Sequence, residues 1–135
     1  MTDNEILIIH GTEYKTMTKK LLEEADLEER IREKAGGRGK NLKIGIKPNL
    51  VAPSDASYGA TTHPEIAAGI IEYLQERNYR NLIILEGSWV GDRTEESFEV
   101  CGYNRLAETY GVTLVDTQKD RVSLHNCKGM ELAVC

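Results

Sequence analysis

Charged and polar side chains directly follow two short apolar runs of the sequence, and these side chains are the ones that could carry chemistry. Lys47 and Asn49 come after the run that ends at Ile46, and Glu86 follows the run Leu82–Leu85. Both runs are typical of strands in an α/β protein. Because ligands of open α/β sheets bind beyond the carboxyl ends of the strands, we expect a site where these side chains lie.

Lys47 and Asn49 offer a cation and an amide at the start of a long loop that runs to Thr62 and contains two prolines. A connection of this length in a compact α/β domain is more often functional than not. Thr61, Thr62 and His63 close the loop at a predicted helix N-terminus, where free backbone N–H groups favour anions. The prediction is a site for a small anionic ligand, a carboxylate or a phosphate, that is bound by Lys47, Asn49, Thr61, Thr62 and His63.

A purely structural interpretation of the same residues is also open. Lys47 can extend its side chain along the apolar surface to reach water. Thr62 and Glu65 have the spacing of a capping box, in which Thr62 caps the helix and Glu65 reaches back to it.

Glu86 and Ser88 place a carboxylate and a hydroxyl at the end of a predicted strand, with Gly87 between them to allow a turn or the close approach of a ligand. Glu86 is the candidate catalytic residue, as a general acid or base or as a metal ligand. Ser88 is a further candidate for ligand binding. The alternative is that Ser88 and Asp92 cap local structure while Glu86 accepts hydrogen bonds from loop N–H groups, so the residues leave open whether the protein is an enzyme.

Recognised motifs for a metal or a nucleotide are missing, so the sequence identifies no metal site and leaves any cofactor unknown. His10, His63 and Asp116 show no metal-binding spacing. The glycine-rich segment 36–41 precedes a predicted strand instead of following one, and Gly87 and Gly91 lack the spacing of a dinucleotide fingerprint. Reduced thiols are the simplest interpretation of the three cysteines, Cys101, Cys127 and Cys135.

Alternating strand and helix patterns indicate which elements position these residues. Short apolar runs predict strands at Asn4–His10, Leu42–Lys47, Leu82–Leu85 and Val112–Val115, with a weaker fifth strand at Arg121–Leu124. Apolar residues three and four apart predict helices at Tyr14–Lys34, residues 62–77 and Asp92–Tyr110, the last divided at Gly102. This order favours an α/β fold, a three-layer sandwich around a mostly parallel sheet of four to five strands.

Size and composition bound the class of protein. A chain of 135 residues that is 40% hydrophobic and 29% charged fits one packed α/β domain over residues 1–135. The net charge of −5 argues against a nucleic-acid partner, and no apolar run is long enough to span a membrane. The N-terminus lacks the features of a secretion signal, so we predict a cytoplasmic protein.

The C-terminal segment Met130–Cys135 is apolar apart from one glutamate and has no polar tail behind it. Such an end is unusual. It leaves open that the chain is a truncated N-terminal portion of a longer protein, and that this segment drives the formation of a homo-oligomer.

Several motifs together resemble the domain of unknown function 362 family. Their order and spacing match over residues 42–120, and they are Lys47–Val51, Ala60–Glu65, Glu86–Ser88, Phe98 with Gly102–Tyr103, Leu106–Ala107 and Gly111–Val112. The family lacks a settled activity. Many members are described as iron-sulfur proteins because they carry an additional ferredoxin-like segment, which this chain does not show, and members usually extend beyond the point where this chain ends.

Three functions follow as hypotheses. The first is a small-ligand or anion-binding α/β domain with its site at the C-terminal ends of the strands. The second, implied by the resemblance alone, is a redox-associated domain that supports an iron-sulfur centre held by missing sequence or by a partner. The third is a non-catalytic interaction module, favoured if the C-terminal segment drives association.

Overall fold

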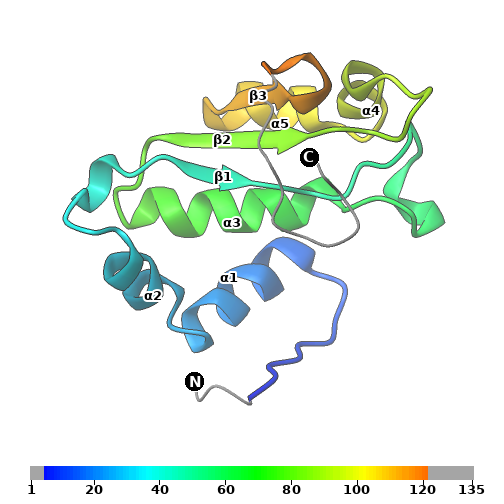
Figure 1. Ribbon diagram of the computed structural model, residues 1–135. Helices are drawn as coiled ribbons and strands as arrows, with labels where there is room; N and C mark the ends of the chain where they lie inside the picture. Colours follow the sequence, from blue (N-terminus) through cyan, green and yellow to red (C-terminus); the bar gives the residue numbers. More distant parts are fainter. Residues whose placement is uncertain (1–4, 122–135) are drawn as a thin grey trace, which may run out of the picture.

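Three parallel strands form the sheet in the computed structural model, which describes residues 5–121 (Figure 1). They are β1 (Ile44–Ile46), β2 (Leu82–Glu86) and β3 (Thr113–Asp116), in the spatial order β1-β2-β3. The register pairs Ile46 with Ile84. The predicted α/β class and parallel pairing are therefore confirmed, whereas the predicted number of four to five strands is wrong for the described chain.

The strand predicted at Asn4–His10 is not formed by its described part, residues 5–10, which runs outside the sheet (Figure 1). Ile6 and Ile8 are 84% and 85% exposed. This apolar run has the composition of a buried strand, but strand formation also needs a neighbouring strand to accept and donate backbone hydrogen bonds. The fifth strand predicted at Arg121–Leu124 lies outside the described residues apart from Arg121.

The helices that connect the strands lie on one face of the sheet. α3 (Pro64–Glu76) leads from β1 to β2, and α4 (Thr94–Val100) with α5 (Tyr103–Tyr110) leads from β2 to β3. Because parallel crossovers are right-handed and both proceed in the same direction across the sheet, α3 and α5 lie side by side. Gln75 Nε2 on α3 donates a hydrogen bond to Tyr110 O on α5 at 2.9 Å.

The boundaries within the second crossover agree in part with the sequence patterns. The predicted division at Gly102 is confirmed, and its φ of 77° is one that glycine adopts without strain. The predicted start of the helix at Asp92 is wrong, because the helix begins at Thr94 and its N-cap residue is Arg93.

A further pair of helices, α1 (Tyr14–Glu24) and α2 (Leu27–Lys34), packs on the side of α3 that faces away from the sheet (Figure 1). The sequence predicts one helix here, but Asp26 has a φ of 52° and separates two. α1 approaches α3 closely at Gly69, where an added Cβ atom would lie 2.6 Å from Lys15 O. No helix in the described range is long and apolar enough to cross a membrane.

The core lies between the sheet and its connecting helices. Ile46, Leu82 and Ile84 point from the strands into a buried cluster with Ile71 and Leu74 of α3. These strand positions alternate with positions on the opposite face, as the two-residue period of a strand requires.

The opposite face of the sheet has no helix over it within residues 5–121. Gly45, Ile83 and Leu85 lie there, and an added Cβ atom at Gly45 would be 2.7 Å from Leu85 Cδ2. The predicted sandwich, with the sheet as its middle layer, is therefore not what these residues form. They place the sheet outermost, because both crossovers turn to one side and α1 and α2 pack on α3.

Candidate functional site

Glu86 ends β2 with a buried carboxylate that is only 3% exposed. Lys47 Nζ donates hydrogen bonds to Oε1 at 2.9 Å and to Oε2 at 3.1 Å. The backbone N–H groups of Leu50 and Gly87 donate to the same carboxylate at 2.8 and 2.7 Å. A buried charge is costly unless it is paired and hydrogen-bonded, and here Lys47, Leu50 and Gly87 donate four hydrogen bonds to it.

Lys47 lies directly above this carboxylate, and 58% of its side chain is exposed. Its ammonium also donates a hydrogen bond to Pro48 O at 3.1 Å. Lys47 and Glu86 are 39 positions apart in the chain, and the parallel pairing of β1 and β2 brings them together at the C-terminal edge of the sheet. The Lys47 ammonium is therefore held by the buried Glu86 carboxylate and is also exposed to solvent.

Asn49 and Thr62 tie together the two ends of the long loop. Asn49 N donates to Thr62 Oγ1 and Thr62 N donates to Asn49 O, both at 2.9 Å, while Asn49 Nδ2 donates to Ala60 O at 3.0 Å. Thr62 therefore serves the loop and does not form the predicted capping box. The N-cap residue of α3 is His63, without a side-chain capping bond.

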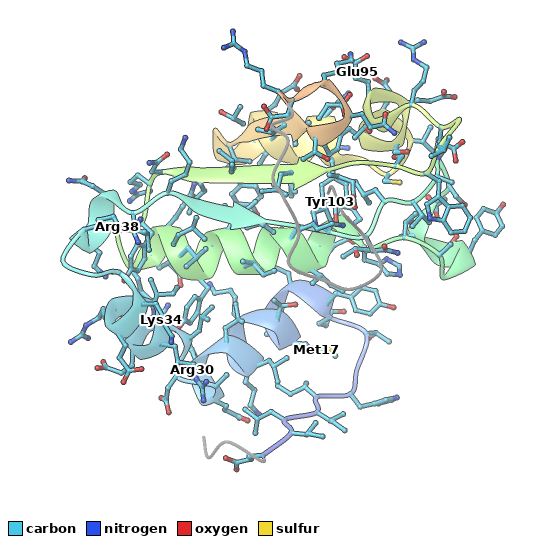
Figure 2. The ribbon with its side chains drawn as sticks, viewed as in Figure 1. Met17, Arg30, Lys34, Arg38, Glu95 and Tyr103 are labelled. Carbon is cyan, nitrogen blue, oxygen red and sulfur yellow. The ribbon has the colours of Figure 1, made fainter. Side chains whose placement is uncertain are left out.

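Buried groups beneath the loop hold its middle. Thr61 Oγ1 donates to Ser54 O at 2.9 Å, and Cys101 Sγ lies 3.1 Å from the same oxygen. Tyr103 OH donates to Thr62 O at 3.1 Å, and burial raises the pKa of Tyr103 above its ordinary value. Tyr103 lies inside the molecule (Figure 2), and the Gly102–Tyr103 motif of the family resemblance was the signal that could have identified it as a loop support.

Ser88 supports the same loop from the end of β2. Its buried hydroxyl donates to Leu50 O and lies 2.8 Å from Ser97 Oγ on α4, and its N–H donates to Thr94 Oγ1 at 3.2 Å. The structure thus places Ser88 beneath the loop, next to Glu86, with its hydroxyl engaged by the protein.

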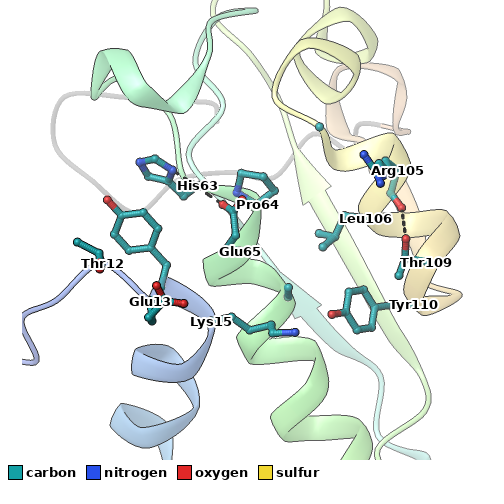
Figure 3. Close-up of a pocket in the computed structure, with 13 residues that line it drawn as sticks. Thr12, Glu13, Lys15, His63, Pro64, Glu65, Arg105, Leu106, Thr109 and Tyr110 are labelled. Carbon is teal, nitrogen blue, oxygen red and sulfur yellow. Dashed lines mark hydrogen bonds and ion pairs between the residues drawn. The ribbon is translucent and has the colours of Figure 1, made fainter.

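His63 differs from the other candidate residues in that it lines a groove of about 720 Å³ between α1, α3 and α5 (Figure 3). Its ring centroid is 4.5 Å from that of Tyr14, and its Nδ1 is 3.9 Å from Glu65 Oε2. The volume falls in the range of small-molecule pockets. Sequence patterns missed this groove, because it depends on how closely α1 packs against α3.

The far end of the groove is closed by an ion pair with a tyrosine. Tyr110 OH and Lys15 Nζ donate hydrogen bonds to Glu72 Oε1 at 2.6 and 2.9 Å. The bond from Tyr110 and then the bond from Lys15 hold the pKa of Glu72 below its ordinary value, and burial with the Glu72 bond raises the pKa of Tyr110. Because these residues belong to α1, α3 and α5, the contact fixes the three helices together.

Exposed and buried residues alternate after β1, and this alternation decides which side chains a ligand would meet at the strand ends. Lys47 and Asn49 are exposed, whereas Pro48 and Leu50 between and after them are buried. Glu86 is covered by its donors. In the described part of the chain, no group of three or more His, Cys, Asp or Glu side chains is arranged to hold a metal ion.

Comparison with known proteins adds a family. The family model described as Domain of unknown function (DUF362) matches residues 44–133, a range that starts at β1 and includes the long loop, Glu86 and Ser88. No curated protein and no solved structure matches the chain.

Proposed function

This chain belongs to the DUF362 family, a domain family of unknown function, and from the contacts of its own residues we propose that it binds a small anionic ligand at the C-terminal edge of the sheet. The ligand is a carboxylate or a phosphate. The observation that carries the proposal is the Lys47 ammonium, exposed to solvent and fixed over the buried Glu86 carboxylate.

The energetics of such a pair favour a functional interpretation. Burying a carboxylate costs several kcal/mol, and its pairing with a cation returns little net stability compared with an apolar residue of similar size. A pair that is no more stabilising than apolar residues of similar size nevertheless fixes one cation at the edge of the sheet where ligands of α/β proteins bind. Lys47 therefore keeps one position, so that an approaching anion meets a cation already in place.

The proposed roles differ among the candidate residues. Lys47 supplies the charge and Asn49 an amide on the same exposed side of the chain. Thr61, Thr62 and Ser88 hold the loop that presents them, as does Glu86, which positions Lys47. A direct acid or base role for Glu86 needs Lys47 to move away from it, and His63 takes part only if the ligand extends toward the α3 N-terminus.

A thermal-shift screen tests the proposal. The full chain is heated with inorganic phosphate, phenyl phosphate or succinate, and ligand at 100 times its dissociation constant stabilises the folded state by about 2.7 kcal/mol. We expect the midpoint to rise with at least one probe and the rise to disappear in Lys47→Ala. Lys43→Ala is the matched control, because Lys43 is an exposed lysine four positions earlier whose loss changes the net charge equally.

Lys47→Ala leaves Glu86 without its cation, so circular dichroism must show that the variant is folded. Lys47→Arg, which keeps the charge, should retain binding and guards against a variant that fails to fold. Stabilisation that is equal in the Lys47→Ala and Lys43→Ala variants, or absent with every probe, would contradict the proposal.

A second candidate is the interaction module, and the face of the sheet that no helix of residues 5–121 covers favours it. Ile83, Leu85 and Val115 are only half buried there, and parallel sheets are normally covered on both faces. Light scattering of the eluted protein at several concentrations tests it, and a strictly monomeric mass at all concentrations would count against it. The predicted role of Met130–Cys135 in association lies outside the described residues, and the redox-associated alternative and the cytoplasmic location stay predictions.

A further inference from the structure

Resting on the proposed anion site, we propose that its ligand also carries a planar ring, which stacks on Trp89. Trp89 is the only tryptophan of the chain. The class of ligand is therefore an aromatic or heteroaromatic acid or phosphate ester.

Hydrogen bonds join the segments that follow β1 and β2, and they bring Trp89 to the same edge of the sheet as Lys47. Glu86 contacts Lys47 and Leu50, and Trp89 N donates a hydrogen bond to Val51 O at 3.0 Å. The segments 47–51 and 86–89 therefore run side by side. Residues later in the first segment lie beside residues later in the second, so Trp89 lies near Val51, further from the strand ends than Lys47.

Exposed and buried positions alternate along both segments, which puts the exposed side chains on one surface. Lys47 and Asn49 are exposed in the first segment, and Trp89 is exposed in the second, where Glu86 and Ser88 are buried. Between the buried Glu86 and Ser88, an added Cβ atom at position 87 would lie 2.5 Å from Thr117 Oγ1, so Thr117 packs against the chain at Gly87.

Hydrogen bonds hold the backbone of the turn that carries Trp89. Asp92 N donates to Trp89 O at 3.0 Å, and Gln118 Nε2 donates to Ser88 O at 2.9 Å. With Trp89 N bonded to Val51 O, the backbone is bonded on both sides of the indole. A fixed backbone lowers the entropic cost of using the side chain in binding.

The indole of Trp89 is largely exposed to solvent, although the backbone of this residue is hydrogen-bonded. Trp89 is 68% exposed and the adjacent Val90 fully so. Among residues 5–121 the ring pair is that of Tyr14 with His63, and both cation-π contacts involve other tyrosines, so neither kind of contact covers Trp89. Exposed aromatic surface beside a fixed cation suits a ligand that combines a ring with an anionic group.

A matched pair of probes separates this inference from the proposed function. Phenyl phosphate and methyl phosphate carry the same anion and differ in the ring. Calorimetric titration should give phenyl phosphate about fivefold tighter binding, with quenching or a blue shift of the Trp89 emission. Trp89→Ala should remove the fivefold preference and leave methyl phosphate binding unchanged, while Trp89→Phe keeps most of the preference.

Tyr58→Ala is the matched control, because Tyr58 is an aromatic residue of the long loop after β1 and is 81% exposed. Equal affinity for the two probes, with binding still lost in Lys47→Ala, would overturn the ring site and leave the anion site standing. A preference that is lost in Tyr58→Ala instead of Trp89→Ala would also overturn it. Binding of neither probe, together with no stabilisation by succinate, would overturn both proposals.

A second copy of the chain is the competing occupant of Trp89. A blue shift of the emission with rising protein concentration and without ligand, together with a dimeric mass, would show the indole to be covered by another chain and would refute the ring site.

Discussion

Replacing Glu86 by glutamine tests whether this buried carboxylate organises the strand-end loop. Glu86→Gln keeps the shape of the side chain and removes its charge. The carboxylate now accepts from Lys47, Leu50 and Gly87 on its two oxygens. A glutamine amide offers one oxygen, and its NH2 group would face a donor on the other side, so at least one backbone N–H group or the ammonium loses its acceptor.

The loss of unfolding free energy depends on whether each group that now bonds Glu86 can find another hydrogen-bond partner. Loss of one partner of a fully buried ion pair costs about 3–5 kcal/mol. Here Lys47 is 58% exposed, so water can solvate its ammonium once the carboxylate is gone. The remaining cost is that of one lost charge-assisted hydrogen bond and of one buried N–H group without an acceptor. We expect Glu86→Gln to lower the free energy of unfolding by about 2–3 kcal/mol.

Urea unfolding followed by circular dichroism measures this difference, and amide hydrogen exchange should show faster exchange at Leu50 and Gly87. Glu95→Gln is the matched control, because Glu95 forms an exposed ion pair with Lys119 and its loss should leave the unfolding midpoint unchanged. If the two substitutions have equal effects, or if loop exchange is unaltered in Glu86→Gln, the carboxylate does not hold the loop.

Three further predictions concern the helices and the supports of the site. Gly69→Ala should cost about 1–2 kcal/mol in urea unfolding, because its Cβ would lie 2.6 Å from a backbone oxygen of α1, and a neutral or stabilising result would show that the helices can separate freely. The Glu72 pKa is lowered by Tyr110, so Glu72 stabilises the fold above its ordinary pKa of about 4.3 and loses this effect as pH falls. Urea midpoints between about pH 5 and pH 3 should therefore fall less steeply in Glu72→Gln, and parallel profiles would contradict this. Ser97→Ala should cost about 1 kcal/mol by the loss of its bond to Ser88, and an unchanged midpoint would mean that the bond does not support the loop.

Local patterns predicted the elements that position the site better than they predicted its contacts. The apolar alternation around Ile46 and the run at Leu82–Leu85 identified β1 and β2, because strand burial leaves a two-residue period in the sequence. The same logic failed at Ile6–Ile9, where an equally apolar run has no adjacent strand in the described chain. An apolar composition shows that a segment can be buried, but it does not show whether a neighbouring strand is available to pair with it.

The candidate site shows the same limit. Lys47 and Glu86 were placed at one edge of the sheet by the rule for strand ends, and they are in contact. The hydroxyl of Thr62 has the spacing of a helix cap, but it accepts a hydrogen bond from Asn49, thirteen positions earlier. Whether the Thr62 hydroxyl caps the helix or bonds Asn49 depends on the fold of the whole loop, so it cannot be predicted from the residues next to Thr62.

The most direct test of the anion site is a titration of the ¹⁵N-labelled chain with phenyl phosphate, followed by amide chemical shifts. The proposal predicts the largest saturable changes at Lys47, Asn49 and Gly87, with small changes at the control position Lys43. Changes confined to the groove between α1, α3 and α5, for example at Arg105, or no saturable change at the strand ends, would contradict it.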